Sequence, residues 1–183
     1  MAGVFNIYNL TAAIAAVDML TDVGMERITE CVENFGGVGG RMEIVSTSPF
    51  VVVDFAHTPD GIAKVLEALG GSKVTVVFGA GGDRDATKRP LMGKEAAMRA
   101  SKVIVTSDNP RSEHPDQIIA DIMAGFKSVD TDKVVVEPDR GSAIALLKNI
   151  SNENDVVIIA GKGHEDYQIL KDKTIHFDDR EEA

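Results

Sequence analysis

The chain has 183 residues, enough for one well-cored domain and a smaller additional piece. Its net charge of −10 argues against non-specific nucleic-acid binding, and its single cysteine excludes a disulfide framework and a cysteine-rich zinc site. No apolar run is long enough to span a bilayer, and no signal peptide precedes the first periodic segment. We therefore expect a cytoplasmic protein with neither nucleic-acid nor membrane partners.

Two helices are predicted at the start of the chain, over 6–20 and 25–35, because apolar residues recur there at helical spacing. The glycine-rich segment 36–40 follows them and predicts a flexible joint. The helical piece before this joint has no core of its own. We therefore expect residues 1–40 to be a helical remnant of a preceding domain plus a hinge, and residues 41–183 to form the main domain.

After the joint, predicted strands alternate with predicted helices. The strands are expected over 41–45, 49–54, 73–78, 102–105, 133–136 and 155–160, and the helices over 59–69, 92–100, 115–126 and 139–150. A short hairpin or edge strand is expected over 167–177. This alternation predicts an α/β fold with a parallel sheet and right-handed crossovers.

The segment DNPR at 108–111 follows a buried β-branched run, and Pro110 forces a turn at Asn109. An acid, an amide and a guanidinium thus lie past the carboxyl end of a strand, where open parallel sheets bind ligands. The Arg111 guanidinium suits a carboxylate, which it can grip through two parallel hydrogen bonds. The alternative is an N-capped helix start with a solvated arginine, and for DNPR taken alone that alternative is favoured.

Two other strand ends are also polar. Asp54 is suited to accept from ribose hydroxyls or to orient His57, although a helix N-cap at Thr58 is the favoured reading of this loop taken alone. The glycine-rich loop 79–82 precedes mixed charges that include Arg84. That combination suggests phosphate or carboxylate handling, with a plain glycine turn as a strong alternative.

The strand predicted over 155–160 runs into GKGHE at 161–165. Lys162 is a candidate to meet an anion and Glu165 to meet an ammonium group, with a surface turn as the alternative. Any one of these loops is easily explained as a turn. Five polar strand-end loops on one rim of a sheet are harder to explain in that way, and they favour a ligand site.

Together these loops resemble the Mur ligases, and within that family the branch that adds meso-diaminopimelate. The matching segments are FNIYNLTAAIAA (5–16), GRMEIV (40–45), DFAHTPD (54–60), GGDRDATKRPLMG (81–93), DNPR (108–111) and GKGHEDYQ (161–168). The first of them resembles the end of the family's central ATPase domain. The resemblance covers nearly the whole chain in the right order, and the combination is more specific than any single motif.

The resemblance implies the Rossmann-like carboxyl-terminal domain of an ATP-dependent ligase, which joins an amino acid to a UDP-muramoyl dipeptide through an acyl phosphate in peptidoglycan precursor synthesis. It implies meso-diaminopimelate, ATP and Mg²⁺ as further small molecules, Mg²⁺ being bound mainly by the central domain, and a monomer. The implied amino-acid site comprises Arg84, Asp108, Asn109, Pro110, Arg111, Gly161 and Glu165. The positions that resemble nucleotide-facing ones are Asn6, Asn9, Arg41, Asp54 and His57. No catalytic residue and no metal ligand is assigned.

The chain departs from the family pattern in having no GxxGK[ST] phosphate loop, no uridine-nucleotide domain and no carbamylated-lysine segment. Phe55 also stands where the family often has tyrosine. We therefore expect a carboxyl-terminal fragment that is inactive alone. The alternatives are a non-catalytic Rossmann-like module that binds a ligand or partner, and a lysine-adding or folylpolyglutamate-type relative. Arg111 argues against the latter, because the lysine-adding relatives typically lack this arginine.

Overall fold

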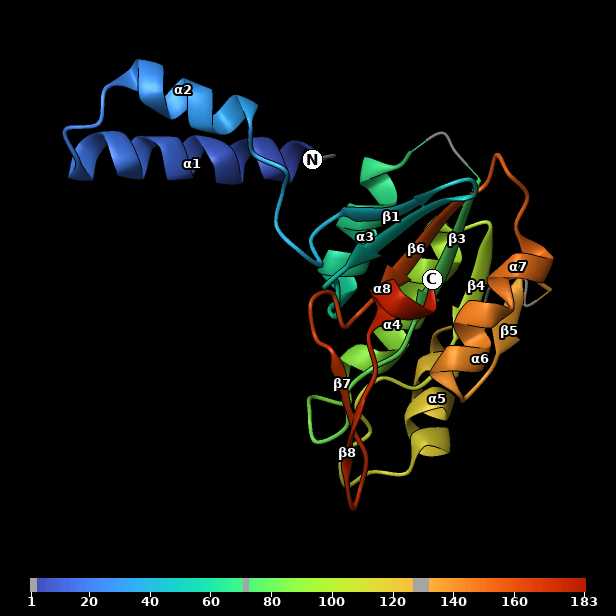
Figure 1. Cartoon of the computed structure of the whole chain (residues 1–183). Coiled ribbons are helices and arrows are strands. Elements are labelled where there is room, and N and C mark those ends of the chain that lie inside the picture. Colours follow the sequence, from blue (N-terminus) through green and yellow to red (C-terminus); the bar gives the residue numbers. More distant parts are fainter. Residues whose placement is uncertain (1–2, 71–72, 127–131) are drawn as a thin grey trace.

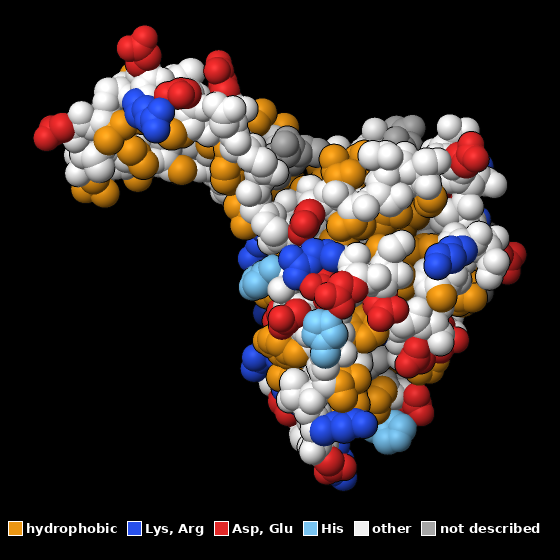
Figure 2. All heavy atoms as spheres, in the orientation of Figure 1, with side chains coloured by type: hydrophobic (Ala, Val, Ile, Leu, Met, Phe, Trp, Pro, Cys, Tyr) orange, Lys and Arg blue, Asp and Glu red, His pale blue; other side chains and the backbone are white. Residues whose placement is uncertain are grey.

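The computed structural model describes residues 3–70, 73–126 and 132–183. Two helices, α1 (Val4–Leu20) and α2 (Met25–Glu33), pack on each other and form an arm that projects from the rest of the molecule (Figure 1). Both predicted helices are confirmed, and α2 ends two residues before the predicted end at residue 35. Apolar side chains remain exposed along this arm (Figure 2), among them Ile7, Met19 and Leu20.

Six strands within the described ranges form one sheet in the order β1-β2-β6-β3-β4-β5. Their bounds are β1 Glu43–Thr47, β2 Phe50–Asp54, β3 Val74–Phe78, β4 Lys102–Val105, β5 Val134–Val136 and β6 Val156–Ala160. Strand β1 is antiparallel to β2, and the other neighbouring pairs are parallel. The predicted mostly parallel α/β sheet is thus confirmed, with β1 as its antiparallel edge strand.

Helices cover both faces of the sheet (Figure 1). One face carries α3 (Pro59–Ala68), α4 (Lys88–Arg99) and α5 (Pro115–Met123), the last of which continues into a 3-10 turn, Ala124–Phe126. The other face carries α6 (Arg140–Ala145) and α7 (Leu147–Ile150). The single helix predicted over 139–150 is therefore divided, at Leu146.

The strands supply both cores because successive side chains along a strand point to opposite faces of the sheet. Val76 and Val103 belong to the core under α3, α4 and α5, whereas Val77 and Ile104 belong to the core under α6 and α7. All five residues of β3 are buried, so this strand is enclosed on both faces. Its continuous β-branched sequence is typical of a central parallel strand.

The last part of the chain forms a hairpin and a short helix. Strands β7 (Tyr167–Ile169) and β8 (Thr174–His176) pair antiparallel, which confirms the predicted hairpin, and α8 (Asp179–Glu182) follows. Within the described ranges, no helix combines the length and the apolar character needed to cross a membrane.

Candidate functional site

The carboxyl ends of four strands lie level at one edge of the sheet. Ala160 pairs with both Asp54 and Phe78, and Phe78 pairs with Val105. The loops that follow these residues therefore meet, as the sequence predicts. We call the loops after β3, β4 and β6, residues 79–84, 106–111 and 161–165, the rim.

The DNPR turn lies at the centre of the rim and is tied to both neighbouring segments. Asn109 is 3% exposed; its Nδ2 donates to Glu165 Oε2 at 2.9 Å, and its Oδ1 accepts from Ile169 N at 2.8 Å. The carbonyl of Asp108 accepts from Gln168 Nε2 at 2.6 Å. The hairpin thus holds the turn in place, and the amide of Asn109 connects it to the GKGHE loop.

Arg111 is half-buried and has a positive φ of 52°. Its Nη1 donates to the carbonyls of Gly82 at 2.9 Å and Asn109 at 3.3 Å. A Cβ atom placed on Gly81 would lie 2.8 Å from Arg111 Nη1 and 3.6 Å from Arg84 Cγ. The two arginines therefore flank Gly81, where a side chain would displace them. The backbone of the turn, rather than the Asp108 carboxylate, holds the Arg111 guanidinium.

Lys162 lies beneath this surface. Its side chain is fully buried, with Nζ at 3.4 Å from Asn109 Oδ1, 3.6 Å from Asp108 Oδ1 and 3.9 Å from Glu165 Oε2, and it also donates to the Tyr167 carbonyl. Burial lowers the pKa of Lys162, and the Asp108 carboxylate opposes that change. The expectation that Lys162 meets an anionic ligand is wrong, because protein oxygens enclose its ammonium group.

Gly161 has a φ of 121°, and a Cβ there would lie 3.0 Å from Asp108 Oδ2. A side chain at this position would therefore crowd the Asp108 carboxylate against the backbone of the loop. Asp108 and Gly161, two of the expected site residues, are thus direct neighbours. Pro110 is buried. A Cβ atom placed on Gly82 would lie only 1.9 Å from the carbonyl oxygen of Pro110. Close approach of the two loops therefore requires glycine at position 82.

Two buried arginines support the rim from below. The sequence signals Arg89 as one of the mixed charges after the glycine loop, where acids are expected to hold the cations, but it does not signal Arg140. Arg140, 1% exposed, donates to both carboxylate oxygens of Asp179 at 2.7 Å and to the carbonyls of Ser107 at 3.4 Å and Ala160 at 3.1 Å. It therefore joins the ends of β4 and β6 across β3, which lies between them. No local pattern signals this role, because Arg140 follows an ordinary helix N-cap at Asp139.

Arg89 is the second of these arginines and is 2% exposed. It donates to Glu113 at 2.8 Å, to Asp121 at 2.9 Å and to the Gly81 carbonyl at 3.3 Å. Acids thus hold a cation in the first turn of α4, as the mixed charges after the glycine loop suggest. The glycine loop is thereby fastened to α5 and the turn before it.

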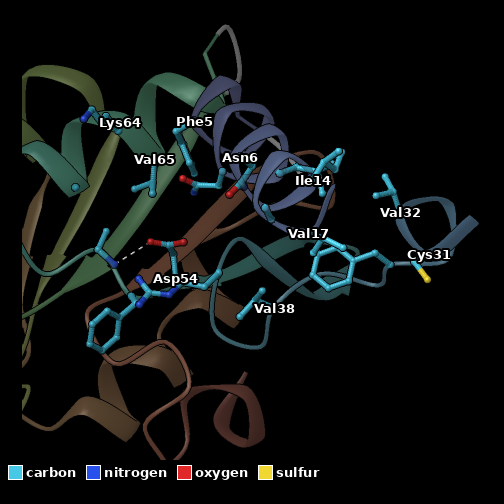
Figure 3. A pocket seen from close by; sticks show the side chains of 18 of the residues that line it. Phe5, Asn6, Ile14, Val17, Cys31, Val32, Val38, Asp54, Lys64 and Val65 are labelled. Carbon is cyan, nitrogen blue, oxygen red and sulfur yellow. Dashed lines mark hydrogen bonds between the residues drawn. The ribbon is translucent and has the colours of Figure 1, made fainter. Parts of the chain in front are cut away.

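A cavity of about 1030 Å³ lies between the arm and the loop after β2 (Figure 3). We call it the arm cavity. Much of its lining is apolar, including Phe5, Ile14 and Val65, while Asn6 from α1 and Asp54 from β2 both face it. The residues expected from the resemblance to face a nucleotide all line this one cavity: Asn6, Asn9, Arg41, Asp54 and His57.

Asp54 is engaged by the backbone rather than by His57. It accepts from Met42 N and Ala56 N, both at 2.8 Å, and burial raises its pKa despite these hydrogen bonds. His57 is exposed, with its Nδ1 2.7 Å from the Phe55 carbonyl. The suggestion that Asp54 orients His57 is therefore not supported. The predicted N-cap is confirmed, because Thr58 accepts from Gly61 N at 3.0 Å.

Phe55 lies between the arm cavity and the rim. The Arg41 guanidinium is 4.4 Å above its ring, and the rings of His57 and His164 lie 4.6 and 5.4 Å away. Gly40, at the end of the glycine joint, reaches the same loop: a Cβ on it would lie 2.1 Å from His164 N. This end of the joint is therefore packed against the rim. At its other end, a Cβ on Gly36 would meet nothing within 4 Å.

Metal-ligating side chains do not gather in the part of the chain that the structure describes. No group of three or more histidine, cysteine, aspartate or glutamate residues there could hold a metal ion. The rim offers guanidinium and carboxylate groups, and the arm cavity offers amides, a buried acid and an aromatic ring under a cation.

Sequence comparison finds close relatives that are longer than this chain. The "UDP-N-acetylmuramoyl-L-alanyl-D-glutamate--2,6-diaminopimelate ligase" of Helicobacter hepaticus is 51% identical over 98% of the chain, which covers 38% of that relative. The enzyme of the same name from Helicobacter pylori is 49% identical over 99% of the chain, which covers 40% of it. The chain thus spans about two fifths of the length of these relatives.

Solved structures show the same fold. A structure titled "UDP-N-acetylmuramoyl-L-alanyl-D-glutamate--2,6-diaminopimelate ligase" matches the whole chain with a TM-score of 0.73 and 39% identity, and the match covers 38% of that structure. The structure of folylpolyglutamate synthase from Mycobacterium tuberculosis matches 88% of this chain with a TM-score of 0.70, and the match covers 38% of that structure. The sequence identity is 19%, so the likeness is one of fold alone. The family model "Mur ligase, glutamate ligase domain" matches residues 40–163. This match, which covers more than half of the chain and the whole six-stranded sheet, places the chain in the Mur ligase family.

Proposed function

We propose that this chain is the carboxyl-terminal part of an ATP-dependent ligase that adds meso-diaminopimelate to UDP-N-acetylmuramoyl-L-alanyl-D-glutamate. Residues 41–183 supply the amino-acid pocket, and residues 1–40 are the end of the preceding ATPase domain together with the joint. The observation that carries the proposal is the pairing of Arg84 and Arg111 around Gly81, beside a Glu165 carboxylate that Asn109 holds. The names of the relatives support the same substrate.

The charges of the rim suit the proposed substrate. Meso-diaminopimelate carries two carboxylates and two ammonium groups. The rim presents two guanidinium groups and the Glu165 carboxylate, while the Asp108 carboxylate is buried beside Lys162. Among the described residues, both hydrogen bonds of the Arg111 guanidinium use Nη1, which leaves Nε and Nη2 for a carboxylate. We assign Arg111 to the distal carboxylate, the group that distinguishes diaminopimelate from lysine.

Charge alone does not distinguish Arg84 from Arg111, but their surroundings do. Arg84 is exposed, whereas Arg111 is half-buried and fixed by two backbone carbonyls. A guanidinium that is already held in place loses less conformational freedom when it binds a carboxylate, so it discriminates better between substrates. We therefore assign selectivity to Arg111 and a supporting role in binding to Arg84.

The arm cavity is the proposed place for part of ATP. In the proposed reaction, ATP transfers its γ-phosphoryl group to the dipeptide carboxylate and becomes ADP. The amine of diaminopimelate then attacks the acyl phosphate, an amide bond forms, and phosphate leaves. Buried Asp54 and the amides of Asn6 and Asn9 suit the hydroxyl and ring nitrogen groups of a nucleoside. We assign the phosphates and Mg²⁺ to parts of the enzyme other than this chain, whose sequence has no GxxGK[ST] loop.

The test uses the complete enzyme that contains this chain. ADP formation is measured with ATP, Mg²⁺ and the UDP-muramoyl dipeptide, with diaminopimelate, lysine or glutamate as the amino acid. We expect formation of the tripeptide product with diaminopimelate and at least about thirtyfold lower kcat/KM with lysine. A preference for lysine would overturn the substrate assignment. A preference for glutamate on a folate substrate would instead favour the folylpolyglutamate-type alternative.

A further inference from the structure

We propose that Lys162 is a positioning residue for the amino-acid site: it fixes the orientation of the Asn109 amide and thereby the place of the Glu165 carboxylate. The proposal rests on the proposed function of the rim and assigns a role to a residue that does not itself reach the substrate. Lys162 is fully buried, so it acts through the groups around it. Those groups are three residues of the rim and the first residue of the hairpin.

The orientation of the Asn109 amide follows from the donors around its oxygen. The side-chain amide of asparagine has an acceptor oxygen and a donor nitrogen that are nearly equal in size. The surrounding donors and acceptors therefore determine on which side the oxygen lies and on which side the nitrogen lies. Lys162 Nζ lies 3.4 Å from Asn109 Oδ1, and Ile169 N donates to the same oxygen at 2.8 Å. A lysine ammonium and a backbone N–H are both donors, so the oxygen must face them. The Asn109 nitrogen therefore faces Glu165, to which it donates at 2.9 Å.

The charges below the rim support the same role. Asp108 Oδ1 is buried and has no hydrogen-bond partner in the described structure, so its compensation is the Lys162 ammonium at 3.6 Å. Arg140 is in turn paired with Asp179 at 2.7 Å. Lys162 therefore compensates Asp108 directly, while Glu165 lies further away at 3.9 Å with its side chain 21% exposed.

This arrangement leaves one carboxylate of the rim, that of Glu165, available to bind a ligand. The buried set contains two cations, Lys162 and Arg140, and two carboxylates, Asp108 and Asp179, and Glu165 is the additional acid at the surface. An ammonium group that binds there meets the Glu165 carboxylate, whose position is set by Asn109. The charge of the neighbouring acid, Asp108, is already compensated by Lys162. Without Lys162, Asp108 and Glu165 would repel each other, and the Asn109 amide would lose one of the donors that orient it.

The experiment compares Lys162→Met with Lys133→Met in the complete enzyme. Lys133 is the control. It is half-buried, and like Lys162 it donates to backbone carbonyls, those of Ala97 and Ala100, but these belong to the end of α4 rather than to the rim. We expect Lys162→Met to raise the KM for diaminopimelate about tenfold. The KM values for ATP and the dipeptide should change less than about twofold, and Lys133→Met should change none of the three.

A double-mutant cycle with Glu165→Gln separates positioning from general damage to the fold. If Lys162 acts through Glu165, adding Lys162→Met to Glu165→Gln should raise the KM for diaminopimelate less than about twofold further. If the two substitutions instead raise the KM for diaminopimelate by the product of their separate effects, the proposal is overturned. An equal rise of all three KM values in Lys162→Met would also overturn it, since that result indicates a structural role.

If Lys162→Met does not fold, Lys162→Gln makes the same decision, because glutamine removes the ammonium charge that compensates Asp108 beside Glu165. A selective rise in the KM for diaminopimelate supports the proposal, and an unselective change or no change contradicts it. The outcome is distinct from failure of the proposed function. If the wild-type enzyme prefers another amino acid, the substrate assignment fails, and the KM for that amino acid then tests the positioning role.

Discussion

On the rim, charged side chains are held by one another and by backbone carbonyls, whereas the arm cavity has a largely apolar lining that two separate parts of the chain provide. The rim is contained within the α/β domain. The arm cavity exists because α1 and α2 lie against the loop after β2, and the arm itself leaves Ile7 and Leu20 exposed. Under the proposed function, the contrast means that one folded unit would select the amino acid, while nucleotide binding would depend on how two parts of the chain are placed.

The largest expected effect concerns the chain by itself. Because it has no GxxGK[ST] loop, whose backbone and lysine would hold the phosphates, we predict that it does not turn over ATP. Phosphate release is measured with diaminopimelate and the UDP-muramoyl dipeptide present, against a blank without protein. Release above the blank that depends on both substrates would show that the arm cavity is a complete nucleotide site.

The next effect is confined to the rim. In the complete enzyme, Arg111→Ala should raise the KM for diaminopimelate about thirtyfold to several thousandfold, because a partly enclosed guanidinium loses its carboxylate partner. The KM for lysine, which lacks that carboxylate, should hardly change. Arg99→Ala, at the far end of α4, is the control, because the partly exposed ion pairs of Arg99 with Glu67 and Glu95 lie away from the rim. Equal effects on both amino acids would place the selectivity elsewhere.

A third variant tests whether the joint connects the two regions. Gly40→Val places a branched side chain where a Cβ alone would lie 2.1 Å from His164 N, at a φ of 66°. The expected cost is roughly 1–3 kcal/mol of stability, with KM raised for both ATP and diaminopimelate. Gly36→Ala, which meets nothing within 4 Å, should leave thermal melting and KM values unchanged. If Gly40→Val affects one substrate alone, the joint serves one region and not both.

The smallest effect belongs to the arm cavity. Arg41 lies over the Phe55 ring at 4.4 Å and is exposed, a geometry that contributes about 0.5–1 kcal/mol. Arg41→Ala should therefore raise the KM for ATP about two- to fivefold. The KM for diaminopimelate should stay constant, and steady-state kinetics of both substrates measure the difference. A larger rise in the KM for diaminopimelate than in the KM for ATP would show that Arg41 serves the amino-acid site at the rim instead.

Local signals made most of the fold predictable from the sequence. Alternating apolar runs located the strands, and Thr58 before Pro59 identified a helix start that the structure confirms. The level strand ends also follow from a parallel sheet, which is why the loops of the rim were expected together. These features depend on residues that are close in sequence or on general rules of sheet topology.

The interior of the site was not predictable in the same way. Lys162 in a glycine-flanked loop has the sequence context of an exposed cation, yet its partner Asn109 is 53 residues away and encloses it. The hinge was predicted over the whole glycine run, but Gly40 is buried by a contact with Gly163, which no local pattern reveals. Long-range burial decides both cases, and composition carries little information about it.

The pair of Arg140 and Asp179 has a consequence for synthesis on the ribosome. The two residues are 39 positions apart, and Arg140 joins the ends of β4 and β6 only when its charge is balanced. At about 5–20 residues per second, translation takes roughly 2–8 s to add Asp179 after Arg140. Once β6 (Val156–Ala160) has been added, the nascent chain has all six strands of the sheet but still lacks Asp179, so it holds an unbalanced guanidinium that favours water over the interior. The rim should therefore be the last part of the domain to become native, after both cores have condensed.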